Sequence, residues 1–145
     1  MALKINRDLK NYICSHVVDV ISGSCGTAGS ATLKIYNGSQ PSDADQGTSG
    51  TLLCTITNIN WGTDWGATTS GTSSLLGTFT GTSGTSGTVG WGRFEYVKNG
   101  YDGTSATFRI DGDIGTAASC VFVVNTLATT AGGTITLTGA TIYMS

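Results

Sequence analysis

The stretch TFTGTSGTSGTVGWGRFEYV, from Thr78 to Val97, poses the choice between a disordered chain and a folded one. Its first half repeats Gly, Thr and Ser, a composition typical of flexible linkers. Its second half predicts a strand, in which Gly90 and Gly92 indicate a bulge or a close backbone approach. Because the repeat is short and enclosed by predicted strands, we expect a loop at one end of a β-sandwich, or an edge strand with its Thr side chains in solvent.

Short segments on both sides of this stretch are also typical of strands. They are ATLKIYN (31–37), TLLCTIT (51–57), LLGTFT (75–80), ATFRID (106–111), SCVFVVNTL (119–127) and TITLTGATIYM (134–144). The run at 119–127 is apolar on both faces, which favours the centre of the sheet or a place under a helix. The apolar phase of the last segment changes near Gly139, which indicates a bulge. Asn37-Gly38 and Asn99-Gly100 are turn signals. The pattern predicts an all-β fold, a β-sandwich of seven to eight strands with jelly-roll or Greek-key winding.

The N-terminal segment has a helical period instead. After Asn6, a candidate N-cap, the apolar residues follow one another at gaps of three and four as far as Gly23. We therefore expect a short helix over about 7–22. The whole chain, 1–145, is predicted to be a single domain, with residues 1–22 as an N-terminal arm or helix and residues 30–145 as the sandwich.

The composition excludes several classes of protein. Only 11% of the 145 residues are charged, 39% are hydrophobic, and the formal net charge is −2. This hydrophobicity with so little net charge argues against disorder, and the scarcity of Lys and Arg argues against nucleic-acid binding. No apolar run approaches the length of a membrane span, and no signal peptide is visible, so we expect synthesis and folding in a cytoplasm.

Candidate contact residues lie near the N-terminus. Lys4, Arg7 and Lys10 are either the solvated side of a helix end or a small docking arm for an acidic partner. His16 is the single histidine of the chain, which excludes a His-cluster metal site. Because it lies on the apolar stripe of the predicted helix, a packed or interfacial role is favoured over catalysis.

The four cysteines are Cys14, Cys25, Cys54 and Cys120. None forms a CxxC pair, so zinc-site spacing is absent. Cys54 and Cys120 alternate with apolar residues and are predicted to be small buried hydrophobes. We expect four free thiols, with Cys14–Cys25 as the one pairing local enough to consider.

Motifs for catalysis or cofactor binding are weak, and we predict no enzyme activity and no cofactor. Glu95 is the single glutamate and shares a strand face with Arg93, which favours a surface charge pair over a glycosidase carboxylate. Asp43/Asp45 in DAD and Asp111/Asp113 in DGDIG partly match calcium loops. Neither has the full spacing with a distal Glu, so turns are favoured over ion sites.

Three tryptophans are each followed by Gly. Exposed Trp61 and Trp65 would be able to stack on sugar rings, although a Trp beside Gly is as readily a core residue. Trp91 is predicted to lie in the core.

Several of these segments together resemble small all-β structural proteins of tailed-bacteriophage virions, with the pattern L-x-I-Y-x-G-x-Q-P, an Asp/Ala-rich turn, G-T-L-L, W-x-R-F and D-G-x-x-G. The matching positions are Leu33, Ile35, Tyr36, Gly38, Gln40, Pro41, Gly50, Thr51, Leu52, Leu53, Trp91, Arg93, Phe94, Asp111, Gly112 and Gly115.

The resemblance implies a non-enzymatic virion protein, assembled in the host cytoplasm. A capsid decoration or cement protein comes first, bound to the major capsid protein and to copies of itself, with a trimer expected. The alternative is a tail or tail-fibre component that contacts a carbohydrate of the host surface. A carbohydrate-active enzyme, which a deep acidic cleft would indicate, is the hypothesis from another class.

Overall fold

The structure is a computed structural model that describes residues 31–59, 66–67, 69–101 and 104–143; for residues 96–108 and 143 the description covers the backbone alone. The described residues are all-β, as the sequence predicted. They form the strands β1 (Ala31–Tyr36), β2 (Leu52–Ile59), β3 (Thr72–Ser74), β4 (Phe79–Thr82), β5 (Gly87–Thr88), β6 (Trp91–Tyr101), β7 (Thr104–Gly115), β8 (Phe122–Val124), β9 (Ala128–Thr129) and β10 (Thr134–Tyr143).

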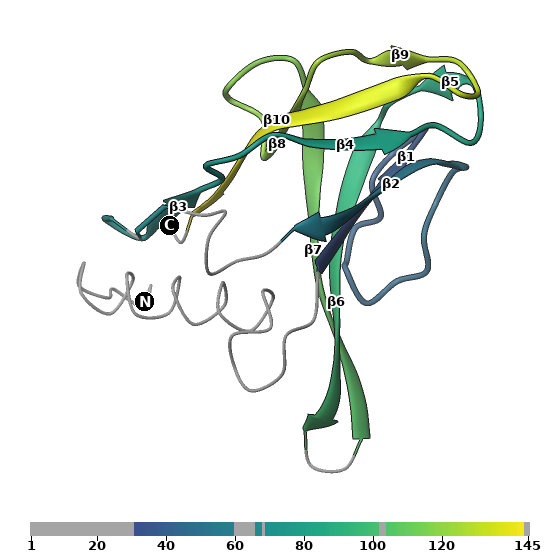
Figure 1. The fold of residues 1–145 in the computed structure, drawn as a ribbon. Helices are drawn as coiled ribbons and strands as arrows, with labels where there is room; N and C mark the ends of the chain where they lie inside the picture. The colour runs from purple at the N-terminus through teal and green to yellow at the C-terminus, as the bar shows by residue number, and fades with distance from the viewer. Residues whose placement is uncertain (1–30, 60–65, 68, 102–103, 144–145) are drawn as a thin grey trace.

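One eight-stranded sheet makes up most of the fold, in the order β2-β1-β6-β7-β8-β10-β3, with β4 also paired to β10. Neighbouring strands in this sheet run antiparallel, except β7 and β8, which run parallel. The sheet curls so strongly that β2 and β4 approach each other, and β5 and β9 form a separate two-stranded sheet (Figure 1). A β-sandwich therefore describes the fold coarsely, because the layers belong to one curled sheet.

The Gly-Thr-Ser repeat lies where the curled sheet nearly closes, at the β2–β4 seam. Ser83 forms an isolated bridge with Cys54, and the Gly84 amide donates to the Leu53 carbonyl over 2.8 Å. A Cβ at Gly81 would lie 2.6 Å from the Cys54 Sγ atom, so only glycine lets β4 approach β2 this closely. The repeat is thus part strand and part loop, and its glycine is needed for the curl.

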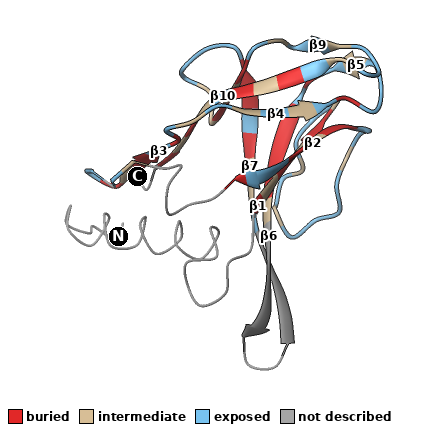
Figure 2. Ribbon diagram, in the orientation of Figure 1, coloured by how far each residue is buried: buried red, intermediate tan, exposed pale blue. Residues whose placement is uncertain are grey.

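The core fills the inside of the curl (Figure 2). Alternate residues of β1 point inward, β2 adds Leu53, Cys54, Ile56 and Ile59, and Phe94 of β6 stacks on Phe122 of β8 with 6.4 Å between ring centroids. β8 lies between β7 and β10, which confirms the predicted central place of its apolar run. A register shift in the β8–β10 pairing between Leu137 and Gly139 confirms the predicted bulge.

Strands β6 and β7 continue past the body as a two-stranded ribbon (Figure 1). Their register runs without a break from Trp91↔Asp113 to Lys98↔Ala106, and shifts once before Tyr101↔Thr104. Asn99-Gly100, a turn signal in the sequence, therefore lies inside β6. Its two residues oppose the single residue Ser105 of β7, which makes a bulge.

The turn predicted for DGDIG is wrong, because residues 111–115 all belong to β7. The predicted helix over about 7–22 lies outside the described residues. Within the part of the chain that the structure describes, no helix has the length and apolar character needed to cross a bilayer.

Candidate functional site: a clasp on the outer face

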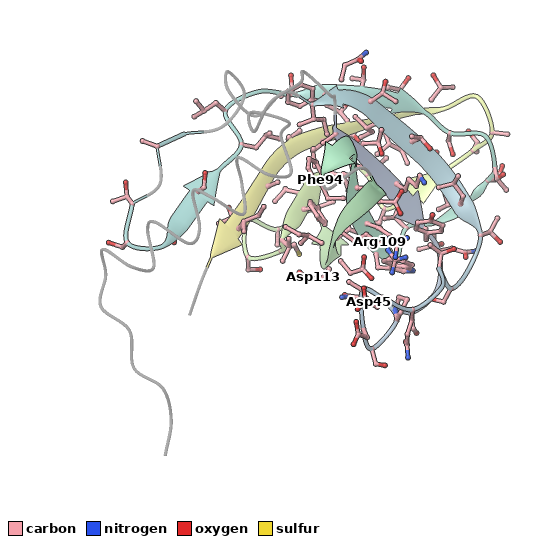
Figure 3. The ribbon with its side chains drawn as sticks, turned by 90° about the horizontal axis from the view of Figure 1, so that it is seen from below. Asp45, Phe94, Arg109 and Asp113 are labelled. Carbon is pink, nitrogen blue, oxygen red and sulfur yellow. The ribbon has the colours of Figure 1, made fainter. Side chains whose placement is uncertain are left out.

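Polar and aromatic side chains gather on the outer face of β1, β6 and β7, beneath the loop of residues 37–51, called here the clasp loop. The cross-strand register aligns Lys34, Tyr36, Trp91, Arg93, Glu95, Arg109, Asp111 and Asp113 on this face. The view along the ribbon shows the two sides of the sheet, with Phe94 inside the curl and Asp45 on the clasp loop outside it (Figure 3).

Arg93 and Asp111 form the centre of this face. The Arg93 Nε atom donates to Asp111 Oδ1 over 2.7 Å, and an Nη atom donates to Oδ2 over 2.6 Å, so the pair is bidentate. Both side chains are buried, at 2% and 4% exposure. The hydrogen bond to Asp111 raises the pKa of Arg93 further above its ordinary value. The second Nη atom donates to the Gln46 carbonyl over 3.1 Å, which attaches the clasp loop to the pair.

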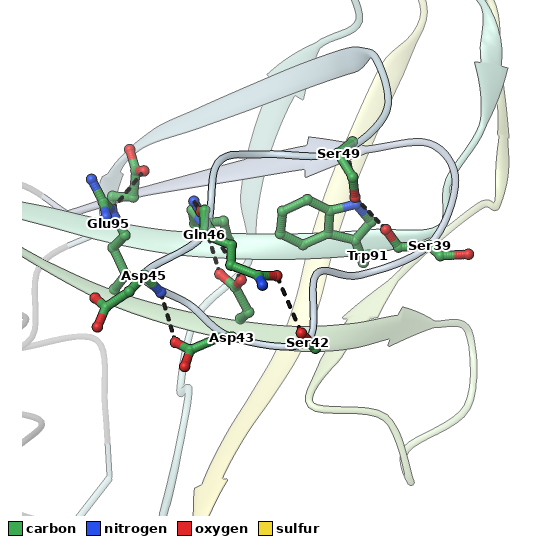
Figure 4. Close-up of polar contacts among 11 residues, drawn as sticks. Ser39, Ser42, Asp43, Asp45, Gln46, Ser49, Trp91 and Glu95 are labelled. Carbon is green, nitrogen blue, oxygen red and sulfur yellow. Dashed lines mark hydrogen bonds and ion pairs between the residues drawn. The ribbon is translucent and has the colours of Figure 1, made fainter.

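An aromatic stack lies beside the ion pair. The rings of Tyr36 and Trp91 are 4.7 Å apart between centroids and 14° from parallel, and the Arg93 guanidinium lies 5.4 Å from the Trp91 ring centroid. The indole nitrogen donates to the Ser49 carbonyl over 3.3 Å, a second attachment of the clasp loop (Figure 4). Trp91 is buried, as the sequence predicted, but under the clasp loop and not inside the curl.

The ends of the clasp loop are fastened through backbone groups. The Asn37 amide donates to the Thr51 carbonyl over 3.1 Å, and the Thr51 amide donates to the Asn37 side-chain oxygen over 2.6 Å. Gly50 has a φ of +79° and its α-carbon faces the Asn37 carbonyl, so a side chain there would be strained and would collide. Gly90 approaches the Gly38 backbone, which confirms the close approach predicted for that glycine.

The Asp pair at the tip of the clasp loop forms a turn, which is the favoured sequence interpretation. The Asp43 side chain accepts from the Asp45 amide over 2.9 Å, and its carbonyl accepts from the Gln46 amide over 3.1 Å (Figure 4). Asp113 accepts from the Val121 amide over 3.0 Å. Among the described residues, no three His, Cys, Asp or Glu side chains lie close enough together to hold a metal ion.

The surface charge pair predicted between Glu95 and Arg93 is wrong. Glu95 pairs with Lys34 over 2.5 Å and with Arg109 over 3.7 Å, both on neighbouring strands. Arg93 pairs with Asp111 instead, because Asp111 is its register partner on β7. The sequence shows which residues share a face of one strand, but the register determines which of them meet.

The structure does not describe the residues that the sequence singled out for contacts. Lys4, Arg7, Lys10, His16, Trp61 and Trp65 all lie outside the described residues, as do Cys14 and Cys25. Cys54 and Cys120 are free thiols; Cys54 is buried, as predicted, whereas Cys120 is only half-buried. The clasp itself was missed, although W-x-R-F and an Asp on a neighbouring strand were visible signals.

Shallow grooves on the described surface include one at the seam and one beside β7. One, of about 240 Å³, lies at the β2–β4 seam between Leu52, Thr55 and Thr82. The other, of about 110 Å³, lies between β7 and β10 and includes Asp111, whose carboxylate is already paired with Arg93. Neither groove presents two free carboxylates, the minimum that glycoside hydrolysis ordinarily requires.

Comparison with known proteins adds no family: no protein-family model, no curated protein and no solved structure matches this chain. The described residues form an all-β fold in which a buried ion pair and an aromatic stack hold a loop onto a sheet.

Proposed function

We propose that this chain is a non-enzymatic structural protein of a tailed-phage particle, and that it decorates the head as a cement protein. It binds the major capsid protein at many regular sites and contacts copies of itself, with a trimer expected. A jelly-roll or Greek-key sandwich and a helix over about 7–22 belong to the same proposal. So does a contact through Lys4, Arg7 and Lys10.

The observation that supports this proposal best is what the residues of the pattern do. Tyr36, Trp91, Arg93 and Asp111, which belong to the virion-protein pattern, meet in the clasp although they come from three strands. The polar groups of Trp91, Arg93 and Asp111 are partnered and buried, so they stabilise a loop and are not free to act on a substrate. A shared pattern whose members serve the fold is typical of a structural protein.

The surface composition is also compatible with a lattice role. Glycine, serine and threonine are common in the loops, and the net charge of −2 gives little repulsion between neighbouring copies. Close-packed repeated contacts are therefore not opposed by long-range electrostatics.

Labelling of purified virions with an antibody to this chain tests the proposal. We expect label spread regularly over the head. Label confined to the tail tip or fibres would contradict the cement role and favour the receptor-binding alternative. Virions that lack the chain by mass spectrometry would exclude a virion role altogether.

The contact itself is tested by adding recombinant protein to virions stripped of it. Removing residues 1–22 should reduce rebinding, whereas Thr85→Lys, an exposed change in the Gly-Thr-Ser repeat, should leave it unaltered. Equal rebinding by the wild type, the variant without residues 1–22 and Thr85→Lys would exclude the N-terminal segment as the contact.

A further inference from the structure

Over six residues, one edge of the β6–β7 ribbon pairs with no strand in the part of the chain that the structure describes. Strand β7 pairs with β6 along its length, but its other edge meets β8 only at Ile114 and Gly115. A Cβ at Gly112 would lie 2.7 Å from the Val121 side chain, so Val121 packs against the face of β7 there. From Thr104 to Arg109, no strand among the described residues pairs with this other edge.

A ribbon of this kind needs further pairing to be stable. Two strands alone are marginally stable in water, whereas three or more strands form an independently stable sheet. The open edge presents a row of backbone donors and acceptors about 20 Å long, which is the length of an ordinary strand. The chemical partner of such a row is another extended polypeptide.

The two edges of the ribbon differ in how they are protected against pairing. The β6 edge carries Lys98 and the bulge at Asn99-Gly100, which are common devices that prevent edge-to-edge association. The β7 edge reads TSATFR over 104–109, with no Lys, Pro or Gly and with the bulged residue on the other strand. The protected edge faces one side of the ribbon, and the unprotected edge faces the other.

We propose that the 104–109 edge of β7 pairs antiparallel with the same edge of a second copy, around a twofold axis. Identical edges are self-complementary only in this arrangement. Thr107 lies on the axis, opposite its own copy, and the single charged residue, Arg109, opposes Ser105 of the second copy at either end. The two Arg109 side chains are thereby kept apart, and the contact makes a four-stranded sheet, β6–β7–β7–β6.

This pairing is separate from the proposed function and does not depend on it. A trimer formed through other surfaces would leave the β7 edge available, and the twofold contact would then join trimers into even-numbered assemblies. The inference therefore concerns the symmetry of one contact, whatever the particle in which it occurs.

The test is the mass of the full-length protein in solution, measured by light scattering after size exclusion at micromolar concentration. We expect an even number of copies. In one variant, residues 98–106 are replaced by Asn-Gly, which joins the register partners Val97 and Thr107 directly. In a second, Thr107→Lys places like charges at the centre of the pairing. Both should halve the mass. Thr80→Lys, the matched change on an exposed position of β4, should not alter it.

Circular dichroism and thermal unfolding show whether each variant is folded, and Thr107→Lys decides the matter if the shortened ribbon is not. A wild-type monomer or trimer would overturn the proposal. So would a folded Thr107→Lys variant with the mass of the wild type.

Discussion

The clasp loop and the Gly-Thr-Ser repeat at the β2–β4 seam have similar compositions but are held in place by different forces. Both are rich in Gly, Ser and Thr, and both cross from one strand to another. The clasp loop, 37–51, is attached to a buried ion pair and an aromatic stack. The repeat, 81–87, is attached to β2 by backbone hydrogen bonds and the Ser83 hydroxyl, which lies 3.0 Å from the Leu53 carbonyl. What a low-complexity loop packs against therefore determines its order, more than its own residues do.

The largest effect is expected from Trp91→Ala. It removes a buried ring that stacks on Tyr36 and donates to Ser49, so the free energy of unfolding should fall by about 3–5 kcal/mol. Urea unfolding followed by circular dichroism measures this. Leu76→Ala, at a 68% exposed side chain, is the control and should change stability by less than about 0.5 kcal/mol. Similar losses from both would mean that the clasp does not stabilise the fold.

At the seam, Gly81→Ala is expected to have the next largest effect. The new Cβ would lie 2.7 Å from the Thr55 carbonyl oxygen, so β4 must move away from β2, at a cost of about 1–3 kcal/mol. Gly84→Ala is the matched control, because a Cβ there meets nothing within 4 Å. If the two variants unfold at the same urea concentration, the seam is not closely packed.

The partly exposed charges beside the clasp should contribute least. Glu95→Gln removes the ion pairs with Lys34 and Arg109, and we expect a loss below about 1 kcal/mol. Because these charges are partly solvated, the difference from wild type should shrink further in high salt. A salt-independent loss as large as that of Trp91→Ala would place Glu95 within the clasp.

Cys54 reports opening of the seam without a change in stability. Burial raises the pKa of its thiol, so the reactive thiolate is disfavoured in the folded chain, most of all below the ordinary thiol pKa. We expect thiol reagents at neutral pH to modify Cys120 before Cys54, and Cys54 only through opening, as peptide mass spectrometry can show. Gly81→Ala should accelerate the Cys54 reaction, and Glu95→Gln should not. Equally fast modification of both thiols in the wild type would contradict a closed seam.

The sequence predicted local structure well where the alternation of apolar residues was clear. It located β1 and β2 within one or two residues, placed the run around Phe122 in the sheet centre, and identified the bulge near Gly139. These features depend on which residues are apolar and where glycine occurs, and both can be read directly from the sequence.

Long-range pairing could not be predicted in the same way. The Arg93–Asp111 pair depends on the β6–β7 register, which no local pattern specifies. The Gly- and Asp-rich DGDIG was assigned to a turn by composition. In the fold, the buried salt bridge and pairing with β6 outweigh its low strand propensity. Curling of the sheet likewise depends on Gly81 meeting β2, a contact between distant segments.

A double-mutant cycle on Arg93 and Asp111 tests most directly whether a buried ion pair forms the centre of the clasp. The variants are Arg93→Met, Asp111→Leu and both together, compared by urea unfolding. Each single change leaves a buried charge without its partner and should cost about 3–5 kcal/mol. The double variant buries no charge and should be more stable than either single variant. Two single losses that simply add in the double variant would contradict the account.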